Sequence, residues 1–131
     1  MPSSIVIDAS ALVELLLQSP RATSIKQAIG DSGLIAPDTL NPEVLSSLRG
    51  LERGGALTAA RASRAVERLS LSRIARVPTR ALLHDAWSLR HNLSAYDAMY
   101  VSLAQSLRCP LLTTDRRLAR APSLGVALIV V

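Results

Sequence analysis

Short apolar runs alternate with longer amphipathic stretches along the chain. Residues 4–7 are mostly β-branched, and residues 126–131 are apolar throughout. Three shorter apolar runs lie between them, and Pro37 and Pro78 close two of these. Continuous apolar runs of this length are typical of strands that are buried on both faces of a parallel sheet. The pattern therefore predicts five strands, at residues 4–7, 34–36, 74–77, 111–113 and 126–131.

The stretches between the strands carry apolar residues at helical spacing. Val44, Leu48 and Leu51, for example, fall on one face of a helix. Gly30 and the glycine pair at 54–55 end two of these stretches. Helices are expected at residues 11–18, 20–29, 41–53, 58–71, 79–92, 94–107 and 116–121. Strands separated by helices indicate an α/β fold with a mainly parallel five-stranded sheet, in one domain over residues 1–131.

Composition excludes several classes of protein. About 49% of the 131 residues are apolar and 19% are charged, which excludes general disorder. The single cysteine, Cys109, has no partner for a disulfide scaffold. No apolar run approaches the ~20 residues of a membrane-spanning helix, and the first residues lack the pattern of a signal peptide. We expect a cytoplasmic protein with no membrane partner.

The charge balance points to a polyanionic partner. The chain has 15 basic and 10 acidic residues, and every basic residue except Lys26 is arginine. The arginine fork matches phosphate oxygens, so nucleic acid is the simplest partner, although many proteins of this charge bind none. Aromatic residues are few, which argues against a base-stacking platform. We expect Trp87, Tyr96 and Tyr100 to pack in the interior.

Four acidic residues occupy special places in this pattern. Asp8 directly follows the first predicted strand, and Asp115 follows the fourth. Glu43 and Asp97 fall in the first turns of two predicted helices. Because parallel strands end at one edge of the sheet, where ligands bind in α/β folds, we expect these carboxylates to lie near one another.

Each acid also has a purely structural explanation. Ser94 and Asp97 fit a capping box, Asp8 and Asp115 are suitable N-cap residues, and Glu43 suits the positive end of a helix dipole. Four carboxylates at one edge would nevertheless repel one another unless a cation were present. Oxygen ligands of this kind suit Mg²⁺ or Mn²⁺. Such a cation among basic residues indicates hydrolysis of a phosphodiester by an activated water.

Four segments carry a resemblance to a known family. They are IVIDASAL at 5–12, PEVL at 42–45, SAYDAMYVSLA at 94–104 and LLTTDRRL at 111–118. Together they resemble the PIN domain, and more closely the VapC toxins of bacterial toxin–antitoxin pairs. The resemblance implies a three-layer α/β/α sandwich and an endoribonuclease that depends on Mg²⁺ or Mn²⁺. It also implies a homodimer and a cognate VapB-type antitoxin.

The resemblance also assigns roles to residues. It makes four acids both catalytic and metal-binding: Asp8, Glu43, Asp97 and Asp115. Asp8 and Asp97 are implied to be the most direct metal ligands. The resemblance places two hydroxyl side chains beside the acids in supporting roles: Ser10 and Thr113. Apart from the resemblance, Arg116 and Arg117 are candidates to contact RNA phosphates. Asp38 is interpreted as a cap of the helix that begins after Pro37. The alternative is that Asp38 is a fifth acid at the same edge of the sheet.

Three other functions are alternatives to the ribonuclease. A response-regulator receiver needs an aspartate after the third strand and a lysine after the fifth, and Lys26 is the chain's only lysine. A phosphatase of the haloacid dehalogenase type needs a second aspartate where this chain has Ser10. A catalytically silent PIN fold that binds RNA or a partner remains the main alternative.

Overall fold

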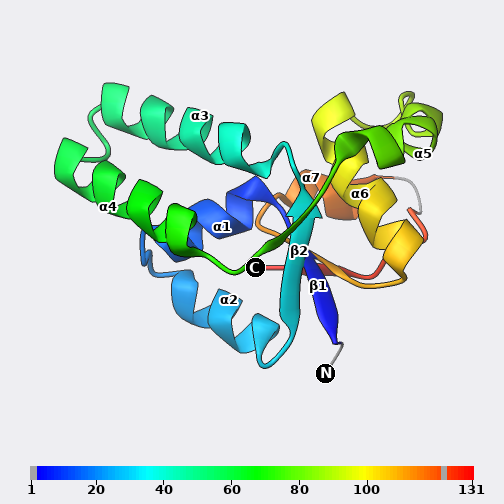
Figure 1. Ribbon diagram of the computed structural model, residues 1–131, viewed down its shortest axis with the longest axis horizontal. Coiled ribbons are helices and arrows are strands. Elements are labelled where there is room, and N and C mark those ends of the chain that lie inside the picture. The colour runs from blue at the N-terminus through cyan, green and yellow to red at the C-terminus, as the bar shows by residue number, and fades with distance from the viewer. Residues whose placement is uncertain (1–2, 122–123) are drawn as a thin grey trace.

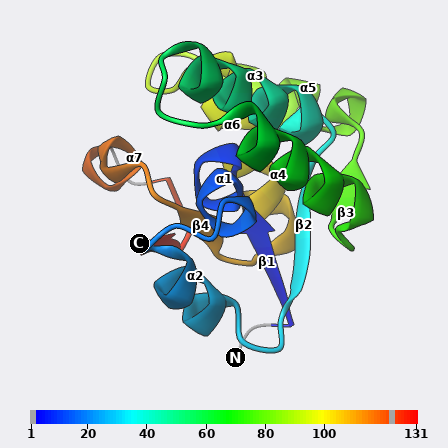
Figure 2. The ribbon, with the colours of Figure 1, turned by 90° about the vertical axis from the view of Figure 1, so that its left-hand side faces the viewer.

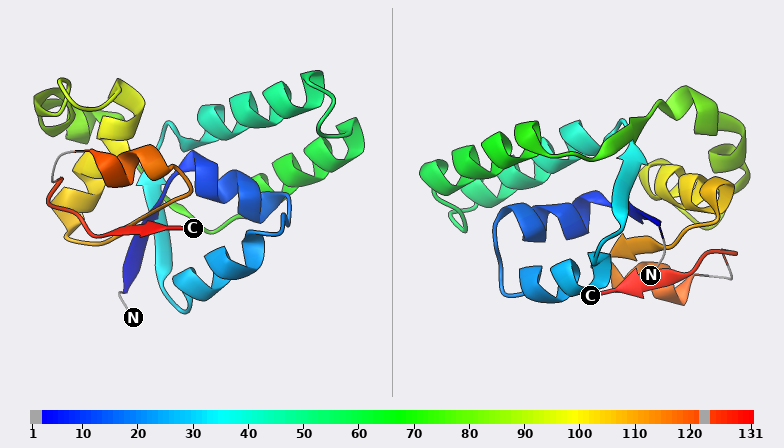
Figure 3. Two further views of the ribbon diagram at one scale, coloured as in Figure 1. Left: turned by 180° about the vertical axis from the view of Figure 1, so that it is seen from behind. Right: turned by 60° about the horizontal axis from the view of Figure 1, so that its bottom comes forward.

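A parallel five-stranded sheet lies at the centre of the molecule. The computed structural model describes residues 3–121 and 124–131 (Figure 1). The strand order is β3-β2-β1-β4-β5, and all neighbouring strands are parallel. The strands are β1 (Ser4–Ile7), β2 (Gly33–Pro37), β3 (Ala75–Val77), β4 (Leu111–Thr113) and β5 (Leu128–Val130). Figure 3 shows β5 beside β4. The predicted parallel sheet is confirmed.

Helices cover both faces of this sheet. They are α1 (Ala9–Leu16), α2 (Ala22–Ile29), α3 (Leu40–Arg53), α4 (Ala59–Leu71), the 3₁₀ helix η1 (Thr79–Leu82), α5 (Leu83–Ser88), α6 (Ala95–Leu107) and α7 (Arg116–Arg120). Helix α6 packs against β1, β2 and β4, whereas α1 contacts β4, α2, α3 and α4. Figures 1 and 2 show α1 to α4 grouped on one side of the sheet and α6 on the other. The three-layer α/β/α arrangement is therefore confirmed.

The buried side chains form one core around the central strand. Ile5, Val6 and Ile7 of β1 are fully buried, as predicted for a strand covered on both faces. Among the described residues, three polar side chains are buried with them: Asp8, Ser102 and Thr113. Because buried polar groups are costly unless they are bonded, these positions call for an explanation. No helix in residues 3–121 and 124–131 combines the length and the apolar character needed to span a membrane.

The structure differs from the sequence prediction around residues 79–92. Residues 79–92 form a 3₁₀ turn and the six-residue α5 instead of one helix. The prediction that Trp87 is in the core is wrong, because its side chain is 68% exposed. The short α5 buries Ala86 instead, while the Trp87 ring lies 4.6 Å from the guanidinium of Arg90, within range of a cation–π contact.

Candidate active site

Two adjacent central strands deliver the first group of candidate residues. Asp8 follows β1 and caps α1, since its Oδ1 accepts the Ala11 N–H at 3.0 Å. Ser10 Oγ donates to the same oxygen at 2.6 Å and lies 3.3 Å from Thr113 Oγ1. Thr113 Oγ1 in turn accepts the backbone N–H of Asp115 at 2.9 Å. The two hydroxyls thus link the two aspartates across the ends of β1 and β4.

The other two acids come from helix starts. Glu43 lies in the first turn of α3, and Asp97 lies in the first turn of α6, where Ser94 Oγ accepts its backbone N–H. Tyr100, one turn after Asp97, is 2% exposed and donates its hydroxyl to Glu43 Oε1 at 3.1 Å. The prediction that Tyr100 is buried is confirmed. Its bond to Glu43 was missed, and the only available signal was that a buried tyrosine hydroxyl needs a partner.

The four carboxylates interact electrostatically. Burial raises the pKa of Asp8, and the charge of Asp97 adds to this, while bonds from Ser10, Thr113 and Ala11 oppose it. Burial likewise raises the pKa of Glu43 and of Asp97, each of which also feels a neighbouring acid. Charges that are desolvated and close together favour protonation unless a cation compensates them. At this edge of the sheet Asp8, Glu43 and Asp97 therefore interact with one another, and Asp115 acts on Asp97.

Asp115 is the exception within this group. Arg117 forms an ion pair with it, with Nη2 at 2.7 Å from Oδ2. The hydrogen bonds from Arg117 hold the pKa of Asp115 below its ordinary value. Arg116 is exposed and makes no ion pair within the described part of the chain. The two arginines predicted to contact RNA thus differ, since only Arg117 is held by the acid cluster.

Asp38 does not join the acids. It is exposed, and its Oδ1 accepts the backbone N–H of Thr79 at 3.2 Å. The prediction that it caps the following helix is wrong, because the N-cap residue of α3 is Thr39. The Asp38 backbone N–H bonds to Val77, which extends the β2–β3 pairing by one residue. Asp38 therefore links the end of β2 to the turn that follows β3 through hydrogen bonds.

The comparison with protein families agrees with this geometry. The model described as "PIN domain" matches residues 5–124, which include every candidate site residue. The chain belongs to the PIN-domain family. This confirms the resemblance found in the sequence.

Three proteins illustrate what the chain is similar to. Ribonuclease VapC3 from Mycobacterium tuberculosis is 42% identical over 121 residues, which is 92% of this chain and 88% of that protein. A crystal structure of PAE2754 from Pyrobaculum aerophilum matches with a TM-score of 0.66 and 28% identity, covering 95% of this chain and 83% of that one. VapC20 from M. tuberculosis, described as a sarcin–ricin loop cleaving toxin, matches with a TM-score of 0.63 and 18% identity, covering 90% and 99% of the two chains.

An open groove of about 700 Å³ in this PIN domain includes Glu43 in its lining. It is lined by residues of α3 and the starts of α1 and α6: Ala9, Thr39, Pro42, Glu43, Ser46, Ser47 and Tyr96. The prediction that Tyr96 packs in the interior is wrong, because its side chain is 62% exposed and lines this groove. The groove thus offers hydroxyl groups and one aromatic ring directly beside a candidate catalytic carboxylate.

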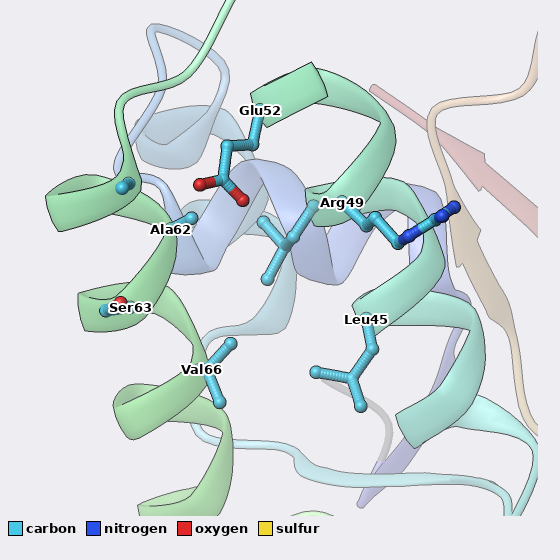
Figure 4. Close-up of a pocket in the computed structure, with 8 residues that line it drawn as sticks. Leu45, Arg49, Glu52, Ala62, Ser63 and Val66 are labelled. Atoms are coloured by element: carbon cyan, nitrogen blue, oxygen red, sulfur yellow. The ribbon is translucent and has the colours of Figure 1, made fainter. Parts of the chain in front are cut away.

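A second, smaller groove separates α3 from α4 (Figure 4). Its volume is about 320 Å³, and Leu45 and Val66 point toward one another across it. Glu52 and Arg49 also line it. None of the four clustered acids lines this groove, so it is separate from the candidate active site.

The acid cluster suits a divalent cation in its chemistry. All four ligand candidates are carboxylates, the ligand type that Mg²⁺ and Mn²⁺ prefer. Within residues 3–121 and 124–131, no three Asp, Glu, His or Cys side chains are arranged closely enough to hold an ion together. Protein-bound Mg²⁺ commonly uses one or two carboxylates and completes its shell with water and substrate phosphates. Asp8 and Asp97 offer ligands of that number and type, and the charge of Asp97 acts on Asp8.

Proposed function

We propose that this protein is an endoribonuclease that hydrolyses RNA with the help of Mg²⁺ or Mn²⁺. The observation that carries the proposal is the electrostatic interaction of three buried or half-buried carboxylates with raised pKa values, Asp8, Glu43 and Asp97. One of them, Glu43, lines an open groove. The ribonuclease name of the 42% identical relative supports the same reaction.

Each residue of the site has a separate role in the proposed reaction. Asp8 and Asp97 would hold the cation, which when bound polarises a phosphate oxygen and lowers the pKa of a water. Glu43, with its raised pKa, is suited to accept a proton from the attacking water. Ser10 and Thr113 fix the orientation of the Asp8 side chain through their hydroxyls. Asp115 completes the acidic group next to Arg117.

The charge distribution favours RNA as the substrate. Setting aside the four clustered acids leaves 15 basic residues against six acidic ones, an excess that attracts a polyanion. Arg116 and Arg117 lie at the start of α7, directly after the cluster, where they would contact phosphates beside the scissile bond.

We further propose that the protein is the toxin of a VapBC-type pair in the cytoplasm. Its partners would then be a cognate VapB-type antitoxin, which blocks the active site, and a second copy of the chain. The names of VapC3 and of the toxin VapC20 support this assignment.

A catalytically silent PIN fold is the second candidate function. It is favoured by the absence of a ready-made three-ligand metal site in the described residues. Such a module would bind RNA without metal uptake and without cleavage.

Cleavage of a mixed, end-labelled RNA pool tests the proposal. The purified protein is incubated with Mg²⁺, with Mn²⁺ or with EDTA, beside the variants Asp97→Asn and Asp85→Asn. Asp85 is an exposed acid on α5 and serves as the charge-matched control. We expect metal-dependent cleavage that Asp97→Asn abolishes and Asp85→Asn retains. Full activity in Asp97→Asn would exclude the assigned metal site. Absence of both cleavage and metal uptake in the unmodified protein would favour the silent module.

A further inference from the structure

Asp115 is the acid of the cluster whose two oxygens both accept hydrogen bonds from one arginine. Its Oδ1 accepts the backbone N–H of Arg117 at 2.9 Å and Arg117 Nε at 3.0 Å. Its Oδ2 accepts Nε at 3.2 Å and Nη2 at 2.7 Å. An ionised carboxylate offers about four lone-pair positions. Arg117 therefore bonds to both oxygens of Asp115 through three N–H groups, since the single Nε hydrogen is shared between them. A metal ion at Asp115 would have to share an oxygen with this arginine or displace it.

The guanidinium of Arg117 still has donors to offer. Arginine carries five N–H donors, and the pair with Asp115 uses only those on Nε and Nη2. The Nη1 donors make no hydrogen bond within the described residues, and the side chain is 82% exposed. The guanidinium of Arg117 is thus fixed by Asp115 at Nε and Nη2, while its Nη1 side is open to solvent. A cation held in this way loses little conformational freedom when it binds an anion.

The position of this guanidinium relates it to the reacting centre. The charge of Arg117 acts on Asp97 as well as on Asp115, so it lies near the start of α6. The remaining three acids would repel an approaching phosphate. A fixed cation beside them would attract the backbone of the RNA and orient it toward the carboxylates.

We propose that Asp115 is an anchor for Arg117 and not a metal ligand, and that Arg117 binds a phosphate of the RNA backbone next to the metal-binding carboxylates. The inference rests on the proposed ribonuclease function and sharpens it. Three of the four acids, Asp8, Glu43 and Asp97, then form the metal-binding group. The fourth acid, Asp115, forms a separate ion pair with Arg117.

Two binding measurements on four variants test this division. The variants are Asp115→Asn, Arg117→Gln, the double variant and Arg53→Gln. Arg53 is an exposed arginine about 15 Å along α3 from Glu43 and controls for the loss of one charge. Binding of Mn²⁺ is measured by calorimetry on the full chain without RNA. Binding of a short mixed-sequence RNA is measured by fluorescence anisotropy in Ca²⁺ over a series of salt concentrations, and a denaturing gel verifies that the RNA stays intact.

The anchor role predicts a specific combination of results. Arg117→Gln weakens RNA binding at least about ten-fold and reduces the slope of log K against log salt by about 0.7, the contribution of one phosphate contact. Asp115→Asn weakens RNA binding in the same direction, the double variant adds little, and Arg53→Gln changes neither quantity. Mn²⁺ affinity stays within about threefold in all variants, whereas even an outer-shell partner of a metal affects affinity by about 10- to 100-fold.

Other results would overturn the inference. A loss of Mn²⁺ affinity of ten-fold or more in Asp115→Asn, or a gain in Arg117→Gln, would show that Asp115 is a metal ligand that Arg117 blocks. An unchanged salt slope in Arg117→Gln would exclude the phosphate contact. In these cases the unmodified protein still binds and cleaves RNA, so the proposed function survives. Failure of the unmodified protein to bind RNA would instead remove the proposed function and this inference together.

Discussion

The hydroxyl of Tyr100 offers the sharpest test of how the site is held together. Tyr100→Phe removes one oxygen, which donates to Glu43 Oε1 at 3.1 Å, and keeps the ring that packs in the core. Because Tyr100 is 2% exposed, water has little room to replace the lost donor. Tyr100 touches neither substrate nor metal in this proposal. It acts as a positioning residue for Glu43.

The size of the effect follows from the type of bond. A hydrogen bond to a charged group contributes about 1.5–3 kcal/mol. At 1.36 kcal/mol for each factor of ten, its loss lowers kcat/KM by about 10- to 150-fold. Outer-shell partners of metal-binding residues show a similar range, about 10- to 100-fold.

The pH dependence supplies a readout that a general structural defect would not move. The Tyr100 hydroxyl favours the charged form of Glu43 and so opposes the burial that raises its pKa. Removing the hydroxyl raises the pKa of Glu43 further. The acidic limb of the pH–rate profile should therefore shift to higher pH in Tyr100→Phe.

The assay is cleavage of end-labelled RNA over a pH series in Mg²⁺, with unfolding by urea to verify the fold. Ser102→Ala is the matched control, because it removes a buried hydroxyl from the same helix. Within the described residues, that hydroxyl bonds only to the Ala98 carbonyl. Ser102→Ala should leave the profile unchanged. A Tyr100→Phe variant with kcat/KM within twofold of the unmodified protein and an unshifted acidic limb would refute the positioning role.

Three further predictions follow from the same site. Thr113→Val should lower the free energy of unfolding in urea by about 1–3 kcal/mol, since Thr113 is fully buried and its Oγ1 accepts the Asp115 N–H; a loss below about 0.5 kcal/mol would contradict this. The pKa of Asp97 is raised, so the folded protein binds a proton at this carboxyl more tightly than the unfolded chain does. The protonated carboxyl therefore contributes its full stabilisation below pH 3.8, the ordinary pKa, and this stabilisation is lost as the pH rises through the pKa of the folded protein. Metal-free Asp97→Asn should therefore gain stability over the unmodified protein as pH rises above about 4, and urea unfolding at several pH values that shows no such gain would exclude the raised pKa. Tyr96→Ala should weaken RNA binding by about 1–3 kcal/mol in anisotropy titrations if a base stacks on this exposed ring, and unchanged affinity would exclude that contact.

The sheet and the position of the acids could be predicted because both depend on local sequence. A strand covered on both faces is a continuous apolar run, as in residues 4–7, so its existence does not depend on its partners. Once the strands are parallel, their ends share one edge, and the acids that follow them meet there. This reasoning located Asp8 and Asp115 without any knowledge of the packing.

Contacts between distant segments were not predictable in this way. The hydroxyl of Tyr100 and the carboxylate of Glu43 are 57 residues apart, and Asp38 and Thr79 are 41 apart. Helix α6 buries residues on most of its circumference, so periodicity could not show that Tyr100 is inside while Tyr96 lies at the groove. Which side of such a helix faces the acids depends on how α3 and α6 pack.

Helix capping and catalysis are not competing explanations for these aspartates. Asp8 and Asp115 both cap helices at the carboxyl edge, so the same geometry places each one at this edge and satisfies a backbone N–H. Their charges nevertheless differ in environment, because burial raises the pKa of Asp8 while the contact with Arg117 lowers that of Asp115. A cap can therefore be read from spacing alone, but its chemical role depends on the neighbouring charge. At this site that neighbour is Asp97 for Asp8 and Arg117 for Asp115, which is why the two caps are expected to respond differently to metal and to RNA.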